Sequence, residues 1–181
     1  MKNNNLLFFD CETGGLNNRT SDLVEAAWIL TDKTGNKVLN SINMRIFPSR
    51  PVDPRAAAVN GYDVNEWRTT AYNLDTVMDI LLHDAKDAIF VGHNAAFYWG
   101  FIEASLASIE KKWTGDYHRL CTASLAWPLM AAGKIEKVRL ESLTAYFGIQ
   151  HEAHRAMGDA SAMRQIYLRL MELYSPIIVN S

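Results

Sequence analysis

Two acidic residues near the start of the chain have the spacing of a metal-binding pair. Asp10 and Glu12 follow the apolar run Leu6–Phe9, which predicts a buried strand that ends at the pair. Residues i and i+2 of an extended chain point to the same side, so the two carboxylates should converge at one edge of a sheet. Hard divalent cations such as Mg²⁺ prefer oxygen ligands of this kind. Asp-x-Glu is also common in solvated turns, and the pair alone leaves both interpretations open.

A histidine and an aspartate near the C-terminus are the second group of candidate residues. His154 lies five residues before Asp159, where the last helix is expected to begin. Histidine is the side chain whose unperturbed pKa suits proton abstraction near neutral pH, and the aspartate could reach a metal ion. The alternative is an exposed loop histidine with an ordinary aspartate in the first turn of a helix. Taken by themselves, the two residues favour that alternative.

The residues between the acidic pair and the middle of the chain predict an antiparallel hairpin. Leu23–Thr31 and Val38–Phe47 are apolar and β-branched enough for two strands. The turn between them, Asp32–Asn36, contains Gly35, which can take a positive φ. Together with the first strand, these segments predict a three-strand antiparallel meander.

The rest of the chain alternates between helical and extended patterns. Three prolines predict an irregular crossing segment after the meander. The alternation predicts an α/β fold in which parallel strands extend the meander into a mixed central sheet flanked by helices. Because the sequence shows no internal repeat or linker, one domain over residues 1–181 is expected. The prolines are Pro48, Pro51 and Pro54; the expected helices are Leu74–His83, Ala95–Ile109, Leu140–Phe147 and Asp159–Tyr174, and the strands Ala88–Val91 and Tyr117–Cys121.

Composition and charge limit the class of protein. The chain has 181 residues, of which 49% are hydrophobic, enough for one domain with a full core. A formal net charge of −2 argues against coating nucleic acid by bulk charge. It does not exclude an enzyme that grips one strand end, because bound metal ions reverse the sign locally. Two cysteines, the absence of a signal-peptide pattern and the absence of a bilayer-spanning run predict a cytoplasmic protein without membrane association.

Three segments together resemble the DEDDh 3′→5′ exonucleases. They are Asp10-Cys11-Glu12-Thr13 followed by Gly and Leu, then His93-Asn94-Ala95-Ala96-Phe97, and finally His154 with Asp159. That family includes proofreading subunits of bacterial replicative polymerases, exonuclease I and ribonuclease T. The resemblance extends over nearly the whole chain. Asp53–Trp67 is similar to the family segment before the first long helix, with Asn60-Gly61 in place of the usual His-Gly, and Arg139–Ile149 is most similar to exonuclease I.

The resemblance implies a ribonuclease-H-like fold and phosphodiester hydrolysis with two Mg²⁺ or Mn²⁺ ions. The resemblance further implies that the first ion is held by Asp10, Glu12 and Asp159, and that Asp10 also faces the second ion. His154 is then the general base that deprotonates the attacking water. The implied partner is a 3′ end of single-stranded DNA or RNA, with a polymerase or another replication or repair protein as a possible second partner. The residues implied to contact the substrate are Cys11, Thr13, Gly14, Leu16, Asn60, Phe97 and Arg155.

The sequence departs from the family pattern at Tyr98. An acidic residue follows the HNAxF motif in the family and helps to place the second ion, which a neutral phenol with a pKa near 10 cannot do. Three explanations are open. The second ion is weakened, and losing roughly 3–4 kcal/mol of transition-state stabilisation slows the enzyme by about two to three powers of ten. Alternatively Glu103 substitutes, or Tyr98 is an engineered change.

Two functions from different classes therefore stay open. The first is a 3′→5′ exonuclease on single-stranded DNA, or an RNA-trimming enzyme of the ribonuclease T kind. The second is a nuclease-derived module that binds a 3′ end or a polymerase with little turnover. Several further side chains could either contact the strand, by base stacking or through phosphate, or be ordinary core and surface residues. These are Trp67, Trp99, Trp113, Lys111, Lys112, Lys134, Lys137 and Arg139.

Overall fold

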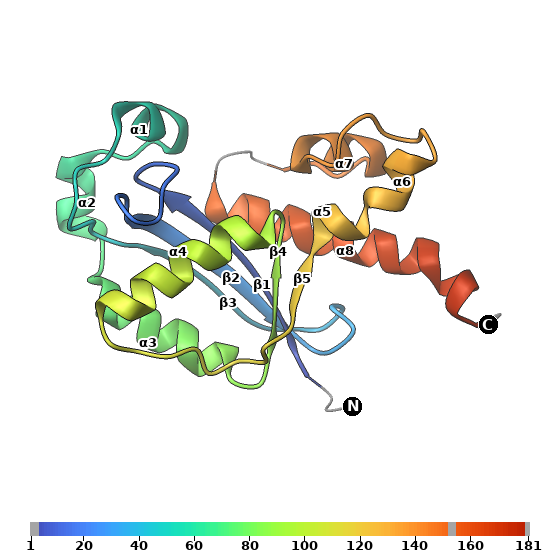
Figure 1. The fold of residues 1–181 in the computed structure, drawn as a ribbon, viewed down its shortest axis with the longest axis horizontal. Helices are drawn as coiled ribbons and strands as arrows, with labels where there is room; N and C mark the ends of the chain where they lie inside the picture. Colours follow the sequence, from blue (N-terminus) through green and yellow to red (C-terminus); the bar gives the residue numbers. More distant parts are fainter. Residues whose placement is uncertain (1–3, 152–154, 180–181) are drawn as a thin grey trace.

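A mixed five-stranded sheet organises the fold, which is described by a computed structural model (Figure 1). The structure describes residues 4–151 and 155–179. The strand order is β3-β2-β1-β4-β5, with β1 at the centre. The antiparallel meander consists of β1 (Leu6–Thr13), β2 (Leu23–Thr31) and β3 (Val38–Arg45), whereas β4 (Ile89–Gly92) and β5 (Arg119–Cys121) continue the sheet in parallel with β1. This arrangement confirms the predicted α/β class with its mixed sheet.

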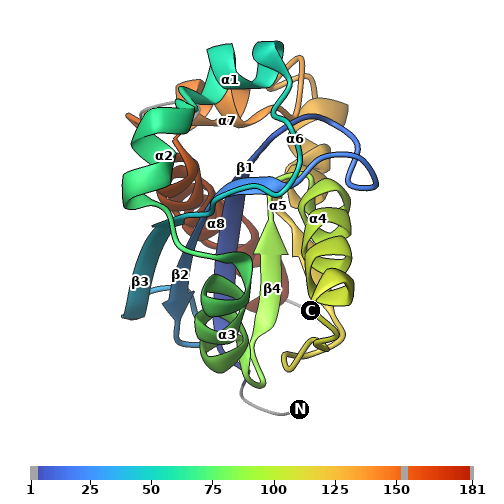
Figure 2. The same ribbon diagram turned by 90° about the vertical axis from the view of Figure 1, so that its left-hand side faces the viewer.

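Helices cover both faces of the sheet (Figures 1 and 2). The helices α3 (Leu74–Ala85) and α4 (Ala95–Ser108) pack on one face, and α8 (Ala156–Val179) crosses the other. Among the described residues, no helix combines the length and the apolar character needed to cross a membrane. The shorter helices lie toward the end of the sheet where β1, β4 and β5 finish; they are α1 (Pro54–Asn60), α2 (Val64–Thr70), α5 (Thr122–Leu125), α6 (Trp127–Ala131) and α7 (Leu140–Phe147).

The central strand β1 is buried on both sides, which its composition explains. Side chains alternate along a strand, so Leu7 and Phe9 enter the core under α3 and α4, whereas Leu6 and Phe8 enter the core under α8. On the α8 side, the ring of Phe8 meets that of Tyr167 edge to face, with centroids 5.4 Å apart. A strand fixed on both faces gives the residues at its end a rigid base.

The observed elements differ from the predicted ones most clearly at β1 and in the proline-rich segment. In addition, β3 and β5 are shorter than predicted, and α8 extends beyond both of its predicted ends. The apolar run ends at Phe9, but β1 continues to Thr13 because its ladder with β2 continues, so the acidic pair lies within the strand. The proline-rich segment is also less irregular than predicted. Pro54 is the first residue of α1, where a missing N–H costs nothing, and the side chain of Asp53 caps that helix by accepting a hydrogen bond from the N–H of Arg55.

Candidate active site

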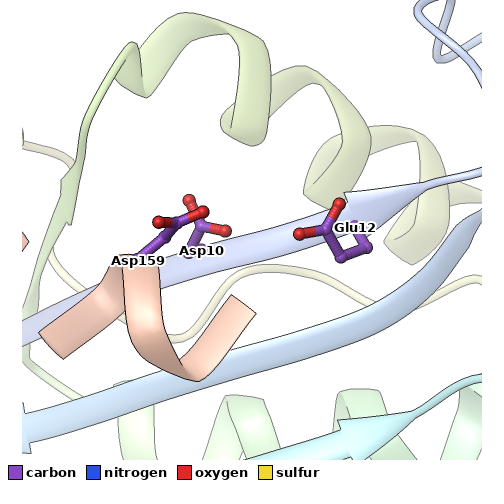
Figure 3. Close-up of side chains that lie close together, drawn as sticks. All are labelled: Asp10, Glu12 and Asp159. Atoms are coloured by element: carbon purple, nitrogen blue, oxygen red, sulfur yellow. The ribbon is translucent and has the colours of Figure 1, made fainter. Parts of the chain in front are cut away.

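Three carboxylates from distant parts of the chain meet at the end of β1 (Figure 3). Asp10 and Glu12 come from the strand, and Asp159 comes from the first turn of α8. One oxygen of each side chain lies within 4.8 Å of the others. The alternation of the strand places the first two residues on one side, and the packing of α8 against β1 adds the third. The structure thus brings together three of the four residues implied by the family motifs.

The local environment opposes a charged carboxylate at Asp10. This residue is only 2% exposed, and burial raises its pKa well above the usual value. A hydrogen bond with Tyr98 lowers the pKa, and the nearby Asp159, Glu12 and Glu25 raise it further. Glu25 lies on β2 directly opposite Glu12, and like charges at opposed positions of a ladder destabilise a sheet. The cluster therefore concentrates negative charge in a place that water screens poorly.

The carboxylates fit a divalent cation. Oδ1 of Asp10 is buried and forms no hydrogen bond with any described residue. A buried acceptor without a partner is costly, and a metal ion would satisfy it. The donor set consists of oxygen atoms alone, which suits Mg²⁺ or Mn²⁺ better than a softer ion. Asp10, Glu12 and Asp159 are the residues that would hold such an ion.

Tyr98 forms the opposite wall of the site from the first turn of α4. Its hydroxyl donates a hydrogen bond to the Asp10 carboxylate. Burial raises the pKa of Tyr98, and the charge of Asp10 raises it further, so the phenol stays neutral. A neutral hydroxyl therefore faces Asp10 where the family motif has an acid.

The turn that precedes Tyr98 is rigid. His93 is buried, and its Nδ1 lies 2.9 Å from Oγ1 of Thr122. Asn94 adopts the left-handed conformation with φ of 69°, and a side chain at Gly92 would come within 2.9 Å of Cα of Ala95. These contacts assign His93 and Asn94 to the shape of the turn, which positions the helix that carries Tyr98.

A hollow of about 420 Å³, the first hollow, opens beside the carboxylates between β1, α1 and α4. Leu16 is 88% exposed at its rim, and Phe97 lines it from α4. Gly15 lines it rather than Gly14, whose N–H and carbonyl bond to Asp22 and Asp53 over 2.8 Å each. Of the residues expected to contact substrate, the lining includes Cys11, Thr13, Leu16, Asn60 and Phe97.

Asn60 and Arg155 form a link beneath this hollow. The Nδ2 atom of Asn60 donates to the carbonyl of Thr13 over 3.1 Å, and its Oδ1 accepts from the N–H of Tyr62 over 3.0 Å. Nη1 of Arg155 donates to the carbonyl of Asn60 over 3.1 Å. Arg155 is otherwise exposed, and its contact with phosphate stays a prediction. The expected general base, His154, lies outside the described residues.

Two residues near the cluster were missed by the sequence analysis. Nε2 of His151 lies 3.4 Å from Oδ1 of Asp159, and the His151 side chain is only 10% exposed. Trp127 lines a second hollow of about 720 Å³, which shares Tyr98 and Asp159 with the first. For His151, its place three residues before His154 was only a weak indication that it lies near the site. For Trp127, nothing in the local sequence distinguished it from a core tryptophan.

Other sequence-based candidates lie away from the cluster. Trp67 and Trp99 are 1% and 8% exposed, so their rings belong to the core rather than to a stacking surface. Lys111 forms ion pairs with Asp75 and Asp79 on α3 at 2.8 and 2.6 Å. Glu103 is exposed on α4 and is absent from the described residues that line the two hollows.

The fold and the cluster define a class: a ribonuclease-H-like domain with three carboxylates gathered at the end of its central strand. Solved structures of exonuclease I, among them one of the E. coli enzyme, share this architecture. The complex with a dT13 oligonucleotide gives a TM-score of 0.85 at 20% identity, covering 98% of this chain and 43% of that one. The ExoI/SSB-Ct complex gives a TM-score of 0.82 at 20% identity, covering 99% of this chain and 43% of that one.

The family follows from the sequence comparisons. The family model described as "Exonuclease" matches residues 7–167, and the chain belongs to this family of divalent-metal-dependent nucleases. Ribonuclease T from Baumannia cicadellinicola is 31% identical, covering 90% of this chain and 81% of that protein. DNA polymerase III subunit epsilon from Treponema pallidum is 25% identical, covering 90% of this chain and 74% of that protein. The PolC-type DNA polymerase III of Thermotoga maritima is 25% identical over 93% of this chain, which spans only 12% of that polymerase.

Proposed function

We propose that this protein is a Mg²⁺- or Mn²⁺-dependent 3′→5′ exonuclease that shortens single-stranded DNA, with RNA ends as a second substrate class. The observation that carries the proposal is the meeting of Asp10, Glu12 and Asp159 within 4.8 Å in a chain of the exonuclease family. The similarity to exonuclease I, whose structure was solved with an oligonucleotide, supports a single strand as substrate. On this proposal residues 1–181 act as one cytoplasmic domain, and a polymerase or repair protein is the expected partner because subunit epsilon is a relative.

The residues around the cluster have separate tasks in the proposed reaction. A bound divalent cation supplies charge neutralisation at the phosphate and a more acidic water. Leu16 and Phe97 flank the 3′-terminal base in the first hollow, and Asn60 fixes the wall beneath it. His154 accepts the proton of the attacking water. Asp10, Glu12 and Asp159 would hold the cation next to the scissile phosphate, and so fix the place where the water attacks.

Tyr98 is proposed to weaken the second metal site. Its hydroxyl bonds to Asp10, and a neutral phenol contributes no negative charge to a cation or its water. Glu103 does not compensate, because it is exposed on α4 away from the described lining of the hollows. The expected cost is roughly 3–4 kcal/mol of transition-state stabilisation, or about two to three powers of ten in rate.

The bond between Tyr98 and Asp10 also favours a second candidate function. A site that holds one cation and a nucleotide, but turns over slowly, acts as a binding module for 3′ ends. Such a module would retain a strand intact, whereas an exonuclease shortens it. The two candidates share every contact described above and differ in rate alone.

A labelled strand tests the proposal. A 5′-labelled single-stranded DNA is incubated with Mn²⁺, and its products are resolved by length; we expect a ladder that starts at the 3′ end and stops with EDTA. The matched control is Asp10→Asn, purified in parallel. If this variant leaves the strand intact, a contaminating nuclease does not explain the cleavage. A strand that stays intact and bound would support the binding module, and one that neither binds nor shortens would contradict both. An RNA of the same sequence measures the preference between substrates.

A further inference from the structure

The second hollow continues the first across a ridge formed by Tyr98 and Asp159. Both side chains line both hollows, so a strand leaving the carboxylate cluster on this side enters the second hollow directly. The second hollow, of about 720 Å³, lies within the usual range of ligand sites, roughly 300–1,000 Å³. Its walls come from the turn before α4, the start of α5, α6 and the start of α7.

Trp127 distinguishes this hollow from an ordinary surface groove. Trp127 is 57% exposed, whereas Trp28, Trp67 and Trp99 are at most 8% exposed. The short helix that carries it is anchored in the core by Ala126 and Leu129, at 0% and 6% exposure. A flat ring held at a fixed place on the wall is a stacking platform, and stacking accepts any base because every base has a π-face.

One positively charged side chain of the hollow, Arg139, is placed to contact a phosphate. Arg139 is exposed immediately before α7, and its guanidinium group forms no hydrogen bond or ion pair with the described residues. It can therefore contact a phosphate without giving up an internal partner. His93 is the other basic residue of the wall, and burial lowers its pKa, so it stays neutral. The negative residues Asp159 and Glu141 also line the hollow, and Asp159 belongs to the cluster where a cation is proposed.

We propose that the second hollow binds the nucleotide that precedes the 3′-terminal one, with its base stacked on Trp127 and its phosphate on Arg139. The inference rests on the proposed exonuclease function and adds the path of the strand. The continuity of the two hollows and the exposed ring carry it. The protein then binds a strand of several nucleotides more tightly than a single nucleotide, with little preference for sequence.

Variants of Trp127 test the inference in a binding assay. A 5′-labelled oligothymidylate with phosphorothioate linkages, which resist cleavage, is titrated with protein in Mn²⁺ and followed by fluorescence anisotropy; thymidine 5′-monophosphate serves as competitor. We expect Trp127→Ala to weaken oligonucleotide binding about tenfold and to leave the mononucleotide unaffected. Trp127→Phe should retain most of the affinity. Tyr117→Ala is the matched control, because Tyr117 is 76% exposed and is absent from the described lining of both hollows.

The outcomes separate this inference from the proposed function. Equal oligonucleotide affinity in Trp127→Ala and the parent protein overturns the inference and leaves the exonuclease proposal standing. Loss of mononucleotide binding in Trp127→Ala overturns it as well, because the two hollows would not be separate sites. If the parent protein binds neither ligand, the proposed function fails and the inference fails with it. Arg139→Gln leaves α6 intact. This variant should lower the affinity for the oligonucleotide about threefold and reduce the salt dependence of binding.

Discussion

The two walls of the candidate site differ in what they offer a cation. The wall built from β1 and α8 presents three carboxylates, one of them with a buried oxygen that has no described hydrogen-bond partner. The wall built from α4 presents a neutral hydroxyl at Tyr98. Both are rigid, since Asp10 is 2% exposed and Trp99, next to Tyr98, is 8% exposed. The comparison teaches that the α4 wall can change its chemistry while the carboxylate wall keeps its geometry.

Breaking the carboxylate wall should have the largest effect. Asp10→Asn removes the charge at the centre of the cluster, so we expect a loss of at least about 10³-fold in rate, equivalent to roughly 4 kcal/mol. Calorimetric titration with Mn²⁺ should show the loss of binding heat, and circular dichroism should show an intact fold. Retained Mn²⁺ binding would mean that the cation does not use this wall.

Restoring the α4 wall should give the next largest change. Tyr98→Asp supplies the missing carboxylate beside Asp10, and we expect the rate to rise by about two to three powers of ten. The Mn²⁺ stoichiometry should rise from one to two. Tyr98→Phe is the matched control, since it removes the hydroxyl but keeps the bulk, and no gain is expected. An unchanged rate and stoichiometry in Tyr98→Asp would refute the account of the second ion.

A smaller effect is expected at the edge of the carboxylate wall. His151 lies 3.4 Å from Asp159, and residues that orient metal ligands typically contribute about tenfold or more to affinity. His151→Ala should therefore weaken Mn²⁺ binding about tenfold, as measured by calorimetry. His83→Ala, an exposed histidine on α3, is the control and should bind Mn²⁺ like the parent protein. Equal affinities in the two variants would show that His151 does not support Asp159.

The smallest effect is predicted on the outer face of α4. Glu103→Gln should change the rate and the Mn²⁺ affinity by less than about twofold, because surface substitutions away from a site are close to neutral. Steady-state cleavage with Mn²⁺ measures the rate, and calorimetry measures the Mn²⁺ affinity. A loss comparable to that of Asp10→Asn would show that Glu103 replaces the missing acid after all.

The sequence predicted the sheet better than the short helices, for a physical reason. The strands β2 and β3 follow from apolar and β-branched runs around a glycine turn, and the boundaries of α7 are as predicted. The short helices α1 and α2 were missed, because their stability comes from caps such as Asp53 and Asp63 rather than from a long apolar stripe.

The site was predictable only in part. The spacing of Asp10 and Glu12 placed two carboxylates together, but the arrival of Asp159 depended on the resemblance, because α8 is distant in sequence. The exposure of Trp127 could not be predicted, since it depends on which face of α6 the core covers. Tyr98 was visible as a departure from the motif, whereas its bond to Asp10 required the fold.

The hydrogen bond from Arg155 to the carbonyl of Asn60 has a consequence for how ligands communicate. It ties the start of α8, and so Asp159, to the segment whose Asn60 side chain holds the backbone of Thr13. On the proposed function, a nucleotide that ordered the α1 wall would also order Asp159, a proposed metal ligand. Thermodynamic reciprocity then requires each of the two ligands to raise the affinity for the other by the same factor.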